Sequence, residues 1–491
     1  MELFGSSGTR GVVGSEMTPG FVVRVAAAAG QVLEGDRVAI GRDTRRTGPM
    51  LADAAASGLM SVGVDVRRLG VVPTPGVQAY ARRNAMPALI VTASHNPPEY
   101  NGVKLIDADG IEADIDTLEA VEAAVLAATE ADAGGQQAPT NTRDAAPTLA
   151  EWSEVGETVQ VCGANEEYTA EVLDGVQGES IEAAGLTVAL DPGHGAGIET
   201  TTAVLRSLGC RVISINAQPD GRFPGRDPEP IEANLGDLRH LVRSTDADIG
   251  IAHDGDADRA MFVDERGGFV NGEAILAALA EATLTPGDTA VAAVTVSQRL
   301  VDVVSAADAS LKLTRVGSTY IVQRIRELQA AGETVPIAGE GNGGVYVPPY
   351  ALRRDGAFLA ARVLELVVKR GDPLSAIVEP FDDYENVRFD IEYESAAQRD
   401  AMAAAVEALA NEPPTAGGGD AGVESDAKPD SPSVTRTDGV RIDYGDAWIL
   451  ARPSGTEPLF RIYGESRREG DASALATAAR DAVVEARDQA A

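Results

Sequence analysis

Two short segments of the chain combine residue types that can do chemistry. The hexapeptide 92–97 reads Thr-Ala-Ser-His-Asn-Pro and follows the apolar run 88–91. A β-rich apolar run that ends in a polar, proline-closed loop is typical of a buried strand delivering side chains to its end. The segment 254–259 reads Asp-Gly-Asp-Ala-Asp-Arg. A serine hydroxyl can act as a nucleophile, and a group of carboxylates can hold a cation.

The hexapeptide alone supports two interpretations of Ser94. His95 is its immediate neighbour, and adjacent side chains do not orient toward each other as a nucleophile and its base must. The G-x-S-x-G elbow typical of serine hydrolases is absent around Ser94. A turn with a helix-capping serine is therefore as well supported by this segment as a reactive serine.

The acidic segment indicates a metal site. Asp254, Asp256 and Asp258 alternate at spacing two, so on an extended backbone their carboxylates point to one side. Three negative charges at such short distances from one another need a cation between them. A calcium EF-hand would use Glu265 at its twelfth position, but Arg259 stands where that loop needs glycine. A solvated acidic turn is the other alternative, and we expect a hard, oxygen-ligated cation, Mg²⁺ above all.

Two further loops are suited to a sugar phosphate. The glycine-rich stretch 339–344 permits close backbone approach to a ligand, although it matches no Walker or Rossmann pattern. Glu340 and Asn342, two residues apart, can offer acceptors and donors to sugar hydroxyls. A phosphate cradle, with an ordinary Pro-Ser-Gly turn as the alternative, is predicted at Arg452, Ser454, the amides around Gly455, and Thr456.

The charge composition limits the partners. The 491 residues carry a formal charge of −35, and only four of the 41 basic residues are lysine. Such a chain would repel nucleic acid and anionic membranes, and it resembles proteins of extreme halophiles, with an ordinary acidic cytosolic protein as the alternative. Lys104 is one of these four lysines and lies just after the serine loop, which favours a chemical need for a titratable amine there.

Other sequence features favour a cytoplasmic protein. The first residues lack the basic and apolar regions of a signal peptide, and no apolar run is long enough to span a membrane. Cys162 and Cys210 form no metal-type or redox spacing. The oligomeric state cannot be read from these patterns.

Strand and helix patterns alternate along most of the chain and predict an α/β fold with mainly parallel sheets. The first domain shows this with strands at 37–41, 64–69 and 88–91 and helices at 19–33 and 50–62. Strands expected further along lie at 187–190, 249–252, 290–296 and 335–338. The predicted domains are 1–148, 149–285, 286–380 and a smaller α+β domain at 381–491, with a disordered insertion at 412–437.

The four loops, in this order and spacing, resemble those of the α-D-phosphohexomutase superfamily, which includes phosphoglucomutase, phosphomannomutase and phosphoglucosamine mutase. The resemblance covers nearly the whole chain. It implies three similar α/β domains, a C-terminal domain resembling the TATA-binding-protein fold, and one site in a central cleft. It also implies interconversion of hexose 6-phosphate and hexose 1-phosphate, with a hexose 1,6-bisphosphate as intermediate and activator.

The resemblance further implies roles for individual residues. Ser94 would be the phosphoserine, and one of its phosphate oxygens would bind Mg²⁺ together with the three aspartates. Arg10 and Lys104 would lie beside the reacting hydroxyl, with Lys104 moving the proton, and Arg259 would neutralise charge on the phosphoryl group. The loop 339–344 would bind the sugar, and the loop around Ser454 would bind phosphate.

One position departs from the superfamily pattern. Many members carry histidine where this chain has Gly344. The G-E-G-N-G-G form is most similar to archaeal members and favours glucosamine phosphate as substrate. The alternatives are a phosphomannomutase/phosphoglucomutase and a non-catalytic sugar-phosphate-binding protein on the same scaffold.

Overall fold

The computed structural model describes residues 3–5, 8–132, 146–411, 413–414, 432–454 and 458–490. The chain forms two compact units. The first comprises Met1–Ile275, Gly317–Gln323 and Asn342–Ile377, and the second comprises Leu276–Val316, Arg324–Gly341 and Val378–Ala491. The chain passes between the units within α9 (Gly272–Thr283), just before and again within α11 (Ser318–Ala330), in the loop after Gly341, and within α13 (Leu374–Val378).

A six-stranded sheet lies in the N-terminal part of the first unit, with strand order β1-β5-β4-β2-β3-β6. Its strands are β1 (Thr9–Val12), β2 (Arg37–Arg42), β3 (Asp65–Val71), β4 (Ala88–Val91), β5 (Tyr100–Ile106) and β6 (Thr158–Gln160). Strands β4, β2, β3 and β6 are parallel, whereas β1 and β5 run antiparallel to their neighbours. The predicted mixed, mainly parallel sheet is therefore confirmed.

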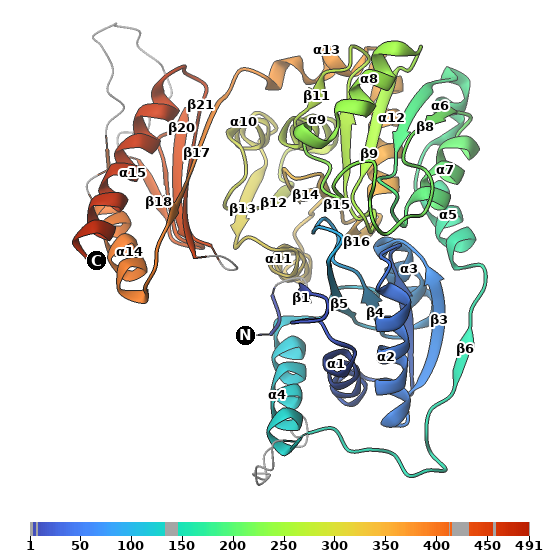
Figure 1. Ribbon diagram of the computed structural model, residues 1–491. Coiled ribbons are helices and arrows are strands. Elements are labelled where there is room, and N and C mark those ends of the chain that lie inside the picture. Colours follow the sequence, from blue (N-terminus) through green and yellow to red (C-terminus); the bar gives the residue numbers. More distant parts are fainter. Residues whose placement is uncertain are drawn as a thin grey trace, which may run out of the picture. The chain divides into compact units, whose positions relative to one another are not determined.

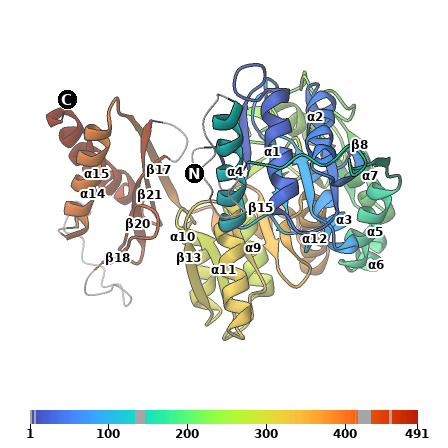
Figure 2. The same ribbon diagram turned by 90° about the horizontal axis from the view of Figure 1, so that it is seen from below.

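Helices cover both faces of this sheet. On one face, α1 (Pro19–Val32) packs between α2 (Gly48–Ser61) and α4 (Ile115–Asp132), as Figures 1 and 2 both show. Helix α3 (Thr74–Asn84) packs against β2 and β4. Alternation along the strands explains the two layers, because Leu89 belongs to the core cluster under α1 and α2 while Ile90 belongs to the cluster under α3.

Strand β6 corrects one predicted domain limit. Residues 158–160 lie within the segment assigned to the second domain, but they pair in parallel with β3 of the first sheet. Three residues with exposed side chains carry no hydrophobic pattern that could reveal this pairing.

A second sheet of five strands follows in the first unit, in the order β11-β10-β9-β7-β8. Its strands are β7 (Thr187–Asp191), β8 (Arg211–Ser214), β9 (Ile249–His253), β10 (Ala260–Val263) and β11 (Phe269–Val270). Strands β8, β7 and β9 are parallel, and β10 and β11 are antiparallel additions. Its helices are α5 (Ala164–Asp174), α6 (Gly178–Ala184), α7 (Ile198–Ser207) and α8 (Gly236–Ser244).

The hairpin of β15 (Gly344–Val347) and β16 (Ala351–Arg354) completes the first unit together with the helix that follows it. Helix α12 (Gly356–Arg370) begins at Asp355, whose side chain accepts a hydrogen bond from the amide of Phe358, and it ends at Gly371 in the left-handed conformation.

In the second unit, β12 (Thr289–Ala293) pairs in parallel with β13 (Ser310–Thr314) and β14 (Ala338–Glu340). Helix α10 (Gln298–Ala306) lies between β12 and β13 in the chain. The strand predicted at 335–338 is wrong in position, since pairing begins at Ala338. Pro336 has no N–H for a strand ladder, so the apolar residues before Ala338 lead into the strand without forming it.

The C-terminal part of the second unit is an antiparallel sheet of order β17-β21-β20-β19-β18. Its strands are β17 (Glu385–Glu392), β18 (Ser433–Thr435), β19 (Val440–Asp443), β20 (Ala447–Pro453) and β21 (Leu459–Ser466). Helices α14 (Ala396–Asn411) and α15 (Asp471–Gln489) pack side by side on this sheet (Figure 1). This is the predicted α+β arrangement.

Part of the predicted insertion 412–437 is ordered. Residues Ser433–Thr435 form β18 and pair with β19, so disorder is the wrong prediction there. A strand of three residues next to a Pro- and Asp-rich stretch has no independent signal, because its partner supplies the stability. Residues 412 and 415–431 lie outside the described residues. In the described part of the chain, no helix is both long and apolar enough to cross a membrane.

Candidate active site

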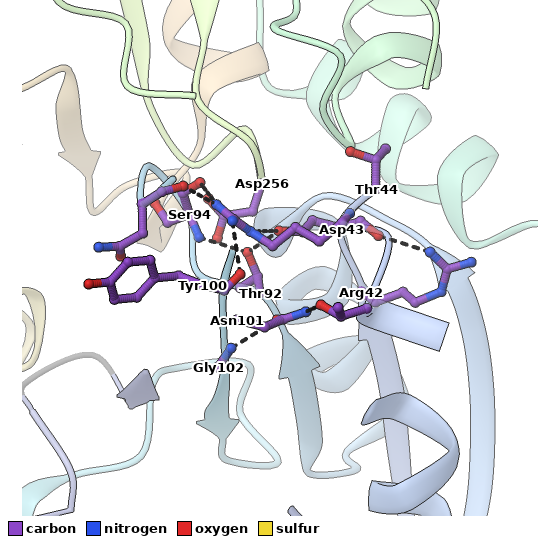
Figure 3. A network of polar contacts seen from close by, with 12 residues as sticks. Arg42, Asp43, Thr44, Thr92, Ser94, Tyr100, Asn101, Gly102 and Asp256 are labelled. Atoms are coloured by element: carbon purple, nitrogen blue, oxygen red, sulfur yellow. Dashed lines mark hydrogen bonds and ion pairs between the residues drawn. The ribbon is translucent and has the colours of Figure 1, made fainter. Parts of the chain in front are cut away.

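Ser94 stands just beyond β4 in a strained backbone conformation. Its φ is 50°, in the left-handed region that L residues avoid, and its side chain is buried. Its amide donates to Thr92 Oγ1 at 2.9 Å, and the Thr92 hydroxyl donates to Asp43 Oδ2 at 2.7 Å. Asp43, Thr92 and Ser94 thus form a chain of contacts between the ends of β2 and β4 (Figure 3).

Arg45 binds the backbone of the serine loop. Its guanidinium is fully buried, and Nε donates to Asp43 Oδ2 at 3.0 Å. The two terminal nitrogens donate to four backbone carbonyls, namely those of Ser94 (2.9 Å), Asn96 (2.6 Å), Pro97 (2.6 Å) and Tyr100 (3.0 Å). Because one rigid fork binds all four carbonyls, it restrains the loop backbone at four points.

The three aspartates come together in a turn after β9. Their carboxylates are buried, and one oxygen from each lies within 4.8 Å of the others. The extended backbone predicted for this segment is wrong, because Ala257 has φ 54°. A turn with a left-handed residue gathers the three side chains instead. A Cβ on Gly255 would lie 2.7 Å from the Ser94 carbonyl, so glycine is required for this approach to the serine loop.

Each aspartate contacts at least one protein group, and Lys104 contacts two of them. The Ser94 hydroxyl donates to Asp254 Oδ2 at 2.7 Å, and the Thr74 hydroxyl donates to Asp256 Oδ2 at 2.6 Å. Lys104 Nζ lies 3.1 Å from Asp256 Oδ2 and 3.2 Å from Asp258 Oδ2. The predicted serine, lysine and carboxylates therefore form one buried group.

The charges in this group shift the pKa values in opposite directions. Burial, and then the charges of Asp258 and Asp256, raise the pKa of Asp254 well above the usual carboxyl range. Burial would also raise the pKa of Asp258, but the surrounding basic groups, led by Arg354 and Lys104, lower it well below that range. Burial alone would lower the pKa of Lys104, but Asp256 and Asp258 more than offset this and raise it. Lys104 is therefore an ammonium in this arrangement.

The donor set fits a hard divalent cation. Asp256 Oδ1 and Asp258 Oδ1 are buried oxygens without a hydrogen-bond partner. Unpaired buried carboxylate oxygens are costly unless a cation takes them. An all-oxygen set of three carboxylates matches the preference of Mg²⁺. The three aspartates can thus bind a metal ion.

Two predicted arginines border the group. Arg259 Nε lies 3.8 Å from Asp258 Oδ1 and 4.0 Å from Asp254 Oδ2. Arg10 Nη1 donates to Asn96 Oδ1 at 3.1 Å, two residues beyond Ser94. His95 Nδ1 is 3.4 Å from Ser94 Oγ, but burial and the charges of Arg259 and Arg10 lower the pKa of His95 to about 2. The Ser94 hydroxyl donates to Asp254, so His95 is not placed as its base.

The predicted sugar loop is divided between the two units, and the predicted phosphate loop belongs to the second unit. In the first unit, Asn342 Oδ1 accepts a hydrogen bond from the Gly344 amide at 3.1 Å. In the second unit, Glu340 is buried at the end of β14, Arg452 pairs with Asp438 at 3.0 Å, and the Ser454 amide donates to the Leu459 carbonyl at 2.7 Å. Gly455 and Thr456 lie outside the described residues.

Three contributors to the site escaped the sequence analysis: Arg45, Thr74 and Arg354. Arg354 Nη2 donates to Asp258 Oδ2 at 2.6 Å. Arg45 and Thr74 follow β2 and β3, the two parallel strands that come after β4 in the sheet order. Polar residues at the carboxyl ends of neighbouring parallel strands are the signal that could have found these two.

Known families and relatives match most of the chain. Four domain families described as phosphoglucomutase/phosphomannomutase match: α/β/α domain I at residues 1–132, domain II at 166–268, domain III at 271–384 and the C-terminal domain at 387–482. A phosphoglucomutase/phosphomannomutase of Thermococcus kodakarensis is 36% identical over 476 residues, which cover 95% of each chain. A probable phosphoglucosamine mutase of Methanopyrus kandleri is 36% identical over 475 residues, covering 96% of this chain and 95% of its own.

Solved structures agree with the sequence relatives. The crystal structure of a phosphoglucomutase/phosphomannomutase family protein from Burkholderia thailandensis has a TM-score of 0.77 and 25% identity. It covers 99% of this chain and 98% of its own.

The fold and the buried serine–carboxylate group define an isomerase of the phosphohexomutase class, an intramolecular phosphotransferase with three α/β domains and a C-terminal antiparallel domain. The chain belongs to the phosphoglucomutase/phosphomannomutase family of the α-D-phosphohexomutase superfamily.

Proposed function

We propose that this phosphohexomutase interconverts glucosamine 6-phosphate and glucosamine 1-phosphate through a phosphoserine at Ser94 and a hexose 1,6-bisphosphate. The observation that carries the chemistry is the contact of Ser94 Oγ with Asp254 Oδ2 at 2.7 Å, beside two carboxylate oxygens that lack a partner. A phosphoryl group on this hydroxyl would lie against three carboxylates, which is tenable only with a cation between them.

The proposed step transfers one phosphoryl group between two oxygens. The bond from phosphorus to Ser94 Oγ breaks as the bond to a sugar hydroxyl oxygen forms, and the proton of that hydroxyl leaves. The Lys104 ammonium is assigned to give a proton to the leaving Ser94 Oγ, and the amine so formed to accept the proton of the sugar hydroxyl, so the proton count is unchanged. Arg10 and Arg259 oppose the negative charge on the phosphoryl oxygens. The second transfer reverses the first with the bisphosphate turned, so Ser94 is phosphorylated again.

Asp254, Asp256 and Asp258 would hold Mg²⁺ together with an oxygen of the phosphoserine. A Mg²⁺ ion bound there would supply neutralisation of charge on the transferring group. The roles of Glu340 and Asn342 toward sugar hydroxyls, and of Arg452, Ser454, Gly455 and Thr456 toward the other phosphate, rest on the resemblance of their loops to those of the superfamily.

Glucosamine phosphate is favoured because the G-E-G-N-G-G loop is similar to that of archaeal members, and because several archaeal relatives carry the name probable phosphoglucosamine mutase. A phosphomannomutase/phosphoglucomutase is the second candidate, because the relative from Thermococcus kodakarensis carries that name at the same identity. We also propose that the enzyme works in the cytoplasm at high salt, as its acidic, lysine-poor composition indicates.

The test compares kcat/KM for glucosamine 6-phosphate, mannose 6-phosphate and glucose 6-phosphate, in concentrated KCl with Mg²⁺ and a hexose 1,6-bisphosphate activator. A strong preference for glucosamine 6-phosphate is the expected result. Equal or faster turnover of the neutral hexoses would overturn the substrate assignment while leaving the mutase chemistry intact. In parallel, peptide mass spectrometry after incubation with the bisphosphate should place one phosphoryl group on Ser94.

A further inference from the structure

The proposed chemistry leaves Arg354 without a role. This arginine is the last residue of β16 and is buried, with 6% of its side chain exposed. Its Nη2 donates to Asp258 Oδ2 at 2.6 Å, which is closer than Lys104 Nζ at 3.2 Å on the same oxygen. Two cations therefore share one carboxylate oxygen, while Asp258 Oδ1 has no hydrogen-bond partner.

The backbone on either side of Arg354 is fixed by a separate buried network. Arg353 contacts Glu171 at 2.6 Å and the Tyr350 hydroxyl at 2.8 Å. Asp355 accepts from the Tyr168 hydroxyl at 2.5 Å and caps α12. Because both neighbours are held on the opposite side of the strand, the Arg354 side chain is aimed at Asp258.

The path of Arg354 depends on Gly344 at the start of the same hairpin. A Cβ on Gly344 would lie 2.6 Å from Arg354 Cδ, a distance that real Cβ atoms essentially never show. Any side chain at position 344 would therefore displace the Arg354 side chain from its observed position. Gly344 and Arg354 form a matched pair in which the missing side chain of one makes room for the other.

We propose that Arg354 is a positioning residue for Asp258, and that Gly344 is glycine in order to admit it. By holding Oδ2, Arg354 fixes the carboxylate so that Oδ1 stays directed at the metal position. Without it, the carboxylate can turn toward Arg259, whose Nε already lies 3.8 Å from Oδ1 and would compete with the ion. This inference rests on the proposed metal-dependent mutase.

The first test measures Mg²⁺ binding by the unphosphorylated protein, from the rise of its melting temperature with Mg²⁺ concentration. R354A should raise the half-saturating Mg²⁺ concentration about tenfold, the usual effect of losing a residue that orients a metal ligand. R354K, which keeps a cation within reach, should recover most of the affinity. R206A, which removes an exposed arginine on α7, is the matched control and should match the wild type.

Unchanged Mg²⁺ affinity in R354A would overturn the proposal. A tighter Mg²⁺ site would overturn it as well, because Arg354 would then act only by repelling the ion. Should R354A fail to fold, R354K and G344A carry the test, since G344A is expected to weaken Mg²⁺ binding by displacing Arg354. These binding measurements do not use turnover. Their outcome therefore does not depend on whether the proposed substrate or the proposed phosphoserine is correct.

The second test separates positioning from a general packing role. G344A and R354A should each lower kcat with KM changed less than about threefold, because neither residue is assigned a contact with the sugar. The double variant G344A/R354A should be no slower than R354A alone, since the alanine at 344 has no arginine left to displace. Losses that multiply in the double variant would show that the two residues act independently and would overturn the pairing.

Discussion

The guanidinium of Arg45 donates to the carbonyl of Ser94 at 2.9 Å while its Nε binds Asp43 at 3.0 Å. One buried cation thus ties the end of β2 to the loop that carries the proposed phosphoserine. Because the same group reaches three more carbonyls of that loop, its fork geometry matters as much as its charge.

R45K should therefore preserve the fold but lower kcat about 10- to 100-fold, because an ammonium cannot satisfy four carbonyls at fixed positions and the serine loop loosens. Steady-state kinetics checks this, with KM expected to change little. R46K at the exposed neighbouring arginine is the control and should retain full activity. R45M is expected to destabilise the protein by about 3–5 kcal/mol, since it leaves Asp43 as an unpaired buried charge.

The left-handed backbone of Ser94 predicts a difference between two inactive variants. S94A and S94G both remove the hydroxyl, so turnover should collapse in both. Alanine keeps the strain of φ 50°, whereas glycine relieves it, so S94G should be the more stable by about 1 kcal/mol. Chemical denaturation measures this difference. Residual turnover near the wild-type rate in either variant would contradict the phosphoserine mechanism.

Removal of one carboxylate should uncouple stability from Mg²⁺. In the wild type, Mg²⁺ is expected to raise the melting temperature, because it takes two buried oxygens that otherwise lack partners. D256N should abolish this rise, and EDTA should no longer alter its melting temperature. D246N, an exposed aspartate at the end of the turn after α8, should respond to Mg²⁺ as the wild type does. A Mg²⁺-dependent rise that survives in D256N would place the ion elsewhere.

Much of the fold could be predicted because it follows from local patterns. The strand 88–91 is a continuous apolar run, and α12 carries both a capping Asp355 and a terminating Gly371. Strands β6 and β18 could not be found in this way. Each has three residues without a strong pattern, and each exists because a longer neighbour offers an edge to pair with.

The site was predicted to the extent that its residues stand in distinctive loops. Ser94 and the three aspartates do, and they are close in space as expected. Arg45 stands in a chain where nearly every basic residue is arginine, so its type carries no signal. Its importance lies in the position of β2 beside β4, which is a property of the sheet order and not of the segment.

The two cysteines should differ sharply in reactivity. Cys162 is exposed, whereas Cys210 is buried and burial raises its pKa to about 11. Since the thiolate is the reactive form, a disulfide reagent at pH 8 should modify one thiol rapidly and the second only after unfolding. In the folded protein, the rate at Cys210 should increase as the pH approaches 11. C162S should lack the fast phase; a fast phase that persists in it would contradict the burial of Cys210.

The net charge of −35 predicts that added salt stabilises the folded protein. Repulsion between exposed carboxylates acts over about 10 Å at 0.1 M salt and about 3 Å at 1 M salt, so the melting temperature should rise with KCl over this range. KCl also acts by exclusion from the surface, and a charge variant separates the two effects. E151Q/E154Q removes two exposed charges beside β6, so it should be more stable than the wild type at low salt and equal to it at high salt. Equal melting temperatures at low salt, together with a flat response to KCl, would show that the acidic surface is not a halophilic adaptation.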